Sequence, residues 1–144
     1  MSLIKKIAMY SFKYKHRIRY ADTDQMGYAY YGNYPKYYEI GRVELIRSLG
    51  FSYKSLETEL GIMLPVVSLE ARYIKPAFYD DELIIETQLK EMPSKMITFH
   101  HLIYNESHEL INKGIVKLFF IDMKSNTRVS APQLLVDNLK PYFE

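Results

Sequence analysis

Residues 33–50, NYPKYYEIGRVELIRSLG, decide the fold because they predict a long helix that is apolar on most of its surface. Asn33 is a favourable N-cap, Pro35 is tolerated in the first turn, and Gly50 can adopt the left-handed conformation that ends a helix. The Tyr, Ile, Val and Leu side chains between these ends cover more than one helix face. Gly41 costs about 1 kcal/mol relative to Ala, which is tolerable where a helix closely approaches a sheet. We therefore expect a largely enclosed helix.

On both sides of this helix the apolar period changes to two, which predicts strands. One strand is expected before the long helix. After it we expect a short helix, then four strands, the last with a bulge at Gly114, and then a terminal helix. These elements are expected at residues 12–20, 53–60, 65–74, 83–92, 96–104, 110–123 and 132–139, in that order. The connections between the last four strands are too short for crossover helices, so they predict an antiparallel meander. The whole pattern favours one α+β domain, residues 1–144, in which a sheet wraps around a central helix.

The composition excludes several classes of protein. The chain has no cysteine, which excludes thiolate nucleophiles, disulfides and cysteine-based zinc sites. Its four histidines are not placed to bind one metal ion, and we expect neither a metal nor a cofactor. No stretch approaches the roughly 18 apolar residues of a membrane span, and the N-terminus has no signal peptide, so we expect a cytoplasmic protein. A net charge of +2 is too small to indicate nucleic-acid binding.

Two carboxylates stand between the first predicted strand and the long helix, in the segment RYADTDQMG of residues 19–27. Asp22 and Asp24 can each close a turn by accepting hydrogen bonds from the local backbone. A carboxylate beside the unpaired N–H groups of a helix start can also catalyse acyl transfer, because those groups can bind an oxyanion. A calcium loop is excluded, since Met26 and Asn33 occupy positions that require oxygen-bearing and bidentate acidic ligands.

The combined pattern resembles the signature of hot-dog acyl-CoA thioesterases of the 4-hydroxybenzoyl-CoA thioesterase type. The likeness rests on the segment of residues 19–27, on YGNY at residues 31–34, and on Tyr38, Glu39 and Arg42 before Gly50. Later segments, YIKPA at residues 73–77 and VKLF at residues 116–119, extend it over nearly the whole chain. The resemblance implies the hot-dog fold and hydrolysis of an acyl-CoA thioester to the free acid and CoA.

The resemblance also implies roles for particular residues. Asp24 is expected to be the catalytic carboxylate, acting either as a general base or as a nucleophile. The backbone N–H of Tyr31 is expected to polarise the thioester carbonyl, and Gly32, Asn33 and Tyr34 at the same helix entrance to bind substrate. Some branches of the family have His where this chain has Tyr31, so only the backbone role carries over. Family members pair edge to edge, which implies a homodimer or a dimer of dimers, often a homotetramer, with active sites at the interface.

Four questions remain open from the sequence. The substrate carrier can be CoA or an acyl-carrier protein, and the acyl group is not defined. Five surface cations are candidates for binding the CoA phosphates, namely Lys75, Lys90, Lys95, Lys124 and Arg128. The rival hypothesis from another class is a non-catalytic acyl-CoA or acyl-carrier-protein binding module with the same fold, which a thiol-release assay distinguishes from an enzyme.

Overall fold

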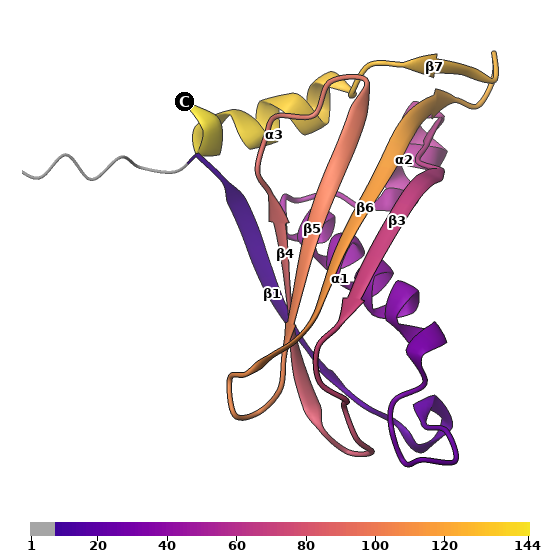
Figure 1. Cartoon of the computed structure of the whole chain (residues 1–144). Helices are drawn as coiled ribbons and strands as arrows, with labels where there is room; N and C mark the ends of the chain where they lie inside the picture. Colours follow the sequence, from indigo (N-terminus) through magenta and orange to yellow (C-terminus); the bar gives the residue numbers. More distant parts are fainter. Residues whose placement is uncertain (1–7) are drawn as a thin grey trace, which may run out of the picture.

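The computed structural model describes residues 8–144, which form a curved antiparallel sheet packed on one long helix (Figure 1). The elements in chain order are β1 (Tyr10–Arg17), α1 (Tyr34–Ser48), α2 (Tyr53–Leu60), β2 (Ile62–Met63), β3 (Val66–Tyr73), β4 (Glu82–Leu89), β5 (Met96–Tyr104), β6 (Leu110–Asp122), β7 (Thr127–Val129) and α3 (Gln133–Phe143). Two 3-10 turns, Tyr20–Asp22 and Tyr31–Asn33, lie between β1 and α1. The expected absence of a signal peptide concerns residues 1–7 in part, and these lie outside the described residues.

The sheet order corrects the predicted meander. The five long strands follow the order β1-β4-β5-β6-β3, so β3 lies beside β6 and not beside β4, its successor in the chain. β4 instead pairs with β1 across the full length of both strands. The short connections predicted the antiparallel direction of the strands correctly. The segment between β3 and β4, however, crosses from one edge of the sheet toward the opposite edge. As a result β1 and β3 form the two edges, as Figure 1 shows.

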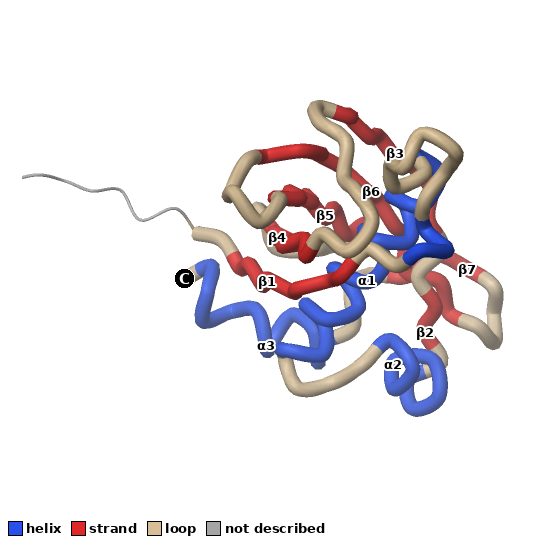
Figure 2. The backbone as a smooth tube through the Cα atoms, turned by 90° about the horizontal axis from the view of Figure 1, so that it is seen from below, coloured by secondary structure: helices blue, strands red, loops and turns tan. Residues whose placement is uncertain are grey.

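The expectation of an enclosed helix is confirmed. The strands curve around α1, which packs against β1, β4 and β5 (Figure 2). Tyr37, Tyr38, Leu45 and Ile46 of this helix have no exposed surface and contribute to the hydrophobic core. Burial of aromatic and aliphatic side chains of this size stabilises the fold by about 1.5–3 kcal/mol each. The helix ends as predicted, because Gly50 has a φ of 99° that a residue with a Cβ rarely adopts.

The start of the helix differs from the prediction at Asn33. The side chain of Asn33 does not cap α1, and its backbone is already helical. α1 itself begins at Tyr34, directly after Asn33 as predicted, but a 3-10 turn from Tyr31 to Asn33 leads into it. The Asn33 amide instead donates a hydrogen bond to the carbonyl of Asp22 at 2.7 Å. Asn33 therefore fixes the preceding loop to the helix entrance.

Two glycines explain how closely the helix lies on the sheet. A Cβ on Gly41 would collide with Thr87 and with Ile85, whose Cγ2 would lie 2.8 Å away, which confirms the predicted close approach. Gly114 does not form the predicted bulge, since its pairing with β3 and β5 is regular. A Cβ there would instead collide with the ring of Tyr38. The glycine in the strand thus makes room for an aromatic ring.

β3, β5 and β6 agree with their predicted ranges within one residue, whereas β4 ends at Leu89 instead of Met92 and α3 extends to Phe143. α2 matches its predicted range, and its Ser52 cap and left-handed Gly61 act as expected. β1 ends at Arg17, so the alternation predicted to reach Tyr20 is wrong at its end, where Tyr20 lies in a turn and is 78% exposed. β2 and β7 were not predicted, because two- and three-residue strands carry no measurable period. No helix among residues 8–144 is long and apolar enough to span a membrane.

Candidate active site

Asp24 closes the tight turn that leads from β1 toward α1. Its Oδ1 accepts hydrogen bonds from the backbone N–H groups of Met26 at 2.9 Å and Tyr28 at 3.2 Å. Its own N–H donates to the carbonyl of Tyr28 at 2.9 Å, and Gly27 takes a φ of 79° within the turn. Oδ2 receives no hydrogen bond from residues 8–144. Asp24 therefore combines the two interpretations of the sequence, with one oxygen holding the turn and the other available to a ligand.

Asp22 has a different environment from Asp24, although only one residue separates them. It is buried, its Oδ1 binds the ammonium of Lys36 at 2.7 Å, and its Oδ2 accepts from the Arg19 N–H at 2.9 Å. Burial raises the pKa of the Asp22 carboxyl, but the hydrogen bonds from Lys36 and Arg19 and the nearby positive charge outweigh it, so the pKa lies below its usual value. Asp22 thus anchors the loop to α1.

The helix entrance presents two backbone donors near Asp24. The N–H groups of Tyr31 and Gly32 are the first of the helical segment and have no intrahelical acceptor. No other acceptor for them is found among residues 8–144. The Tyr31 side chain is 63% exposed. Gly32 lies so close to the Tyr30 ring that a Cβ would come within 2.5 Å of it.

A cavity of about 280 Å³ brings most of the predicted residues together. Its wall includes Asp24, Tyr31 and Tyr34 among the predicted residues, but neither Gly32 nor Asn33. Asn33 lies outside this cavity wall, and its side chain bonds the Asp22 carbonyl. The other lining residues are Met26, Tyr28, Ala29, Tyr73, Ile74, Lys75 and Pro76. Of the five candidate cations, Lys75 alone lines the cavity, and it pairs with Glu109.

Aromatic side chains build the cavity wall. Tyr34 is 2% exposed, and its ring meets those of Tyr73 and Tyr37 edge to face at 5.2 and 5.3 Å. Burial, with a smaller contribution from Tyr73, raises the pKa of Tyr34 to about 12, so its hydroxyl remains protonated. Tyr73 reaches across from β3 and donates a hydrogen bond to the Tyr31 carbonyl at 3.0 Å. This places the end of β3 against the helix entrance.

Sequence reasoning did not assign Tyr73, Met26 or Tyr28 to the site. Tyr73 belongs to a strand that is more than 40 residues from Asp24 in the chain, and its alternating pattern indicated only a sheet position. The one sequence feature that could have indicated Tyr73 was the segment YIKPA, which formed part of the family likeness but was given no role. Among residues 8–144 no group of three or more acidic or histidine side chains could hold a metal ion.

Comparison with known proteins fits this geometry. The Thioesterase-like superfamily matches residues 18–139. The chain belongs to this superfamily. YneP of Bacillus subtilis is 34% identical over 117 residues, which are 81% of this chain and 84% of that protein. The acyl-CoA thioester hydrolase YbgC of Escherichia coli O6:H1 is 30% identical over 129 residues, 90% of this chain and 96% of YbgC.

The solved structures agree with this superfamily assignment. The DHNA-CoA thioesterase of Staphylococcus aureus superposes with a TM-score of 0.78 at 32% identity, covering 83% of this chain and 80% of that one. The hot-dog fold expected for a thioesterase of this superfamily is thereby confirmed. Asp24 in the wall of an aromatic cavity is the structural feature on which the assignment of a reaction depends.

Proposed function

We propose that this chain is an acyl-CoA thioesterase in which Asp24 is the catalytic carboxylate. One observation carries the proposal: Asp24 is held by its Oδ1 while Oδ2 is unpaired, and the residue lines an apolar cavity beside the helix entrance. A carboxylate with a fixed orientation loses little entropy on reaching the reactive geometry. Membership of a thioesterase superfamily supports the same reaction.

The helix entrance supplies the second component of the mechanism. The N–H groups of Tyr31 and Gly32 donate to the thioester carbonyl oxygen, and the dipoles of the 3-10 turn and α1 favour negative charge there. Asp24 then either takes a proton from water that attacks the carbonyl carbon, or attacks that carbon itself and forms an anhydride that water hydrolyses. In both routes the C–S bond breaks and the thiolate of CoA leaves with a proton from solvent or from Asp24.

The aromatic wall supplies the acyl-binding component. Tyr34 presents a buried ring and Tyr73 a half-exposed ring next to the helix entrance, and Met26, Ile74 and Pro76 add apolar contacts. Removing an acyl chain from water against these side chains contributes about 25 cal/mol per Å² of apolar surface. Lys75 at the same cavity is the cation best placed to meet a CoA phosphate, provided that it leaves Glu109.

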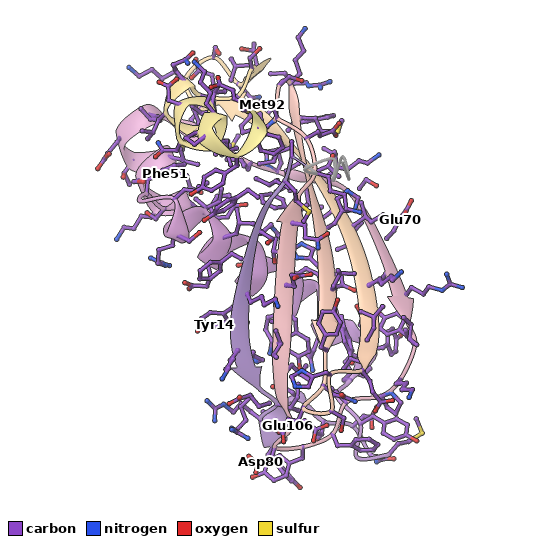
Figure 3. The ribbon with its side chains drawn as sticks, turned by 90° about the vertical axis from the view of Figure 1, so that its left-hand side faces the viewer. Tyr14, Phe51, Glu70, Asp80, Met92 and Glu106 are labelled. Carbon is purple, nitrogen blue, oxygen red and sulfur yellow. The ribbon has the colours of Figure 1, made fainter. Side chains whose placement is uncertain are left out.

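The free edge of the sheet supports a homodimer. β3 pairs with β6 on one side only and exposes Val67, Leu69 and Tyr73 by 44, 41 and 49%. Leu69 and Tyr73 share one face of the strand, where Tyr73 contacts the Tyr34 ring of α1 and Leu69 remains exposed. Figure 3 shows the same edge strand, with the polar Glu70 of the opposite face pointing outward. Pairing of β3 with β3 of a second copy would satisfy the edge and cover the apolar face.

A thiol-release assay with a panel of acyl-CoAs tests the proposal. Release of CoA thiol at rates that depend on enzyme concentration supports the thioesterase. Thermal stabilisation by acyl-CoA without any turnover would instead support the non-catalytic binding module. No structural observation favours that module, because the carboxylate, the backbone donors and the cavity are all present.

A further inference from the structure

A second cavity, of about 270 Å³, lies between the two helices and the start of β3. Glu39, Arg42 and Val43 of α1 and Tyr53 and Glu57 of α2 line it, together with Leu64, which precedes β3, and Leu118 of β6. None of these residues lines the Asp24 cavity. The walls are apolar at Val43, Leu64 and Leu118, whereas the polar groups come from the helices.

Arg42 is the unusual member of this cavity. The residue is 8% exposed, and its Nη1 is buried without a hydrogen-bond partner among residues 8–144. Arg17 and Arg47 each form an ion pair with a carboxylate, but no ion pair to Arg42 is found in the same range. A buried N–H donor without an acceptor is costly, since it has lost its hydration without replacement. Glu39 and Glu57 line the same cavity without bonding Nη1, so this donor is open to an acceptor that enters the cavity.

Tyr53 adds a second buried donor to the same cavity. Its hydroxyl also lacks a hydrogen-bond partner among residues 8–144. Burial raises the pKa of the Tyr53 phenol, with the charge of Arg42 opposing the rise, so the hydroxyl keeps its proton. Glu39 and Glu57 are exposed at the same cavity and would repel a carboxylate. The lining therefore suits a neutral oxygen, a hydroxyl or a carbonyl, at the end of an apolar chain.

The position of β3 connects this cavity with the active site. Leu64 precedes the strand and Leu118 pairs with Val66 at its start, so the Arg42 cavity lies at the beginning of β3. Tyr73 ends the strand and lines the Asp24 cavity. When two copies of β3 pair antiparallel about their centres, the start of one strand lies beside the end of the other, about 4.8 Å away. The Arg42 cavity of one subunit then adjoins the Asp24 cavity of its partner.

We propose that Arg42 and Tyr53 of one subunit bind a neutral oxygen at the far end of the acyl group whose thioester is held at Asp24 of the other subunit. This subsite rests on the proposed thioesterase function and on the proposed β3 dimer. It deepens that function by defining a substrate class, acyl groups with a distal hydroxyl or carbonyl. Selectivity arises because an unsubstituted chain leaves the two buried donors unpaired, whereas an oxygen-bearing chain satisfies them.

The first test compares kcat/KM for straight-chain acyl-CoAs of four to ten carbons with their ω-hydroxy, ω-oxo and ω-carboxy counterparts. At the best chain length, the hydroxy or oxo substrate should exceed the unsubstituted one by about tenfold, as expected for one or two hydrogen bonds to buried donors. The carboxy substrate should be the poorest. Arg42→Met and Tyr53→Phe should each remove most of this preference, and Arg47→Met, on the outer surface of the same helix, should retain it.

The second test asks which subunit supplies Arg42. Asp24→Asn and Arg42→Met chains with different affinity tags are co-expressed, and the mixed dimer is purified. If the partner supplies Arg42, one of the two sites in the mixed dimer has both wild-type residues, and the wild-type preference for the oxygen-bearing substrate returns. If each subunit uses its own Arg42, the only site that keeps Asp24 lacks the arginine and no preference returns, which overturns the shared subsite.

The outcomes separate this inference from the proposed function. Hydrolysis of unsubstituted acyl-CoAs by the wild-type protein supports the thioesterase whatever the selectivity. Equal kcat/KM for oxygen-bearing and unsubstituted chains in an otherwise active enzyme overturns the subsite alone. If Arg42→Met does not fold, Tyr53→Phe, which removes one oxygen atom, gives the same answer, since an unchanged preference in that variant also contradicts the proposal.

Discussion

The carboxylate of Asp22 binds the ammonium of Lys36 at 2.7 Å and thereby ties the loop after β1 to the first turns of α1. Asp24, two residues later, has no such partner and lines the cavity. We therefore expect Asp22→Asn to lower the free energy of unfolding by about 1–3 kcal/mol, because a charge-assisted hydrogen bond is lost. Chemical denaturation measures this change, and unaltered stability would contradict the anchoring role.

Asp24→Asn, in contrast, should lower activity and leave stability nearly unchanged. The amide oxygen can still accept from the Met26 and Tyr28 N–H groups, so stability should change little. The loss of the negative charge should lower kcat by about 10²- to 10⁴-fold, because neither a base nor a nucleophile remains. Thiol release and thermal melting, measured on the same preparations, provide the two readouts. Near-wild-type turnover in this variant would show that Asp24 serves only the turn.

Leu69→Lys should dissociate the dimer. It places a charge on the exposed apolar surface of β3, where a second copy is expected to bury Leu69. Light scattering should give a mass near 17.1 kDa for the variant and at least twice that for the wild type. Leu134→Lys on α3 is the matched control, since Leu134 is equally exposed at 42% and lies away from β3. A wild-type protein that is monomeric at micromolar concentration would refute the β3 interface.

His101 should make the fold sensitive to acid. Burial, with smaller contributions from Arg42 and His100, lowers the pKa of His101 to about 3, whereas an unfolded histidine titrates near 6.5. Between these values the unfolded chain binds the extra proton, so stability falls as the pH drops below about 6.5, by up to about 1.4 kcal/mol per pH unit. Denaturation at pH 7, 6 and 5 should show this slope, and His101→Gln should reduce it. Equal slopes in both proteins would contradict the assignment.

The sequence alone determined the local elements of this protein. The period of apolar residues changes between the long helix and the strands, and this change depends only on which residues neighbour one another in the chain. Gly50 and Gly61 ended their helices as predicted, because a positive φ is a local requirement that glycine meets. The segment of residues 19–27 located Asp24 for the same reason, since a turn and its carboxylate lie within a few residues.

Only the tertiary structure decided how distant segments meet. β4, β5 and β6 form the predicted meander, but β3 pairs with β6 and not with β4, because short connections fix strand direction but not the choice of neighbour. Asn33 and Gly114 took roles set by Asp22 and Tyr38, partners more than ten residues away. Tyr73 reached the Asp24 cavity and Arg42 was buried without a partner for the same reason. Such long-range contacts arise from packing in three dimensions, and no local pattern in the chain specifies which distant residues meet.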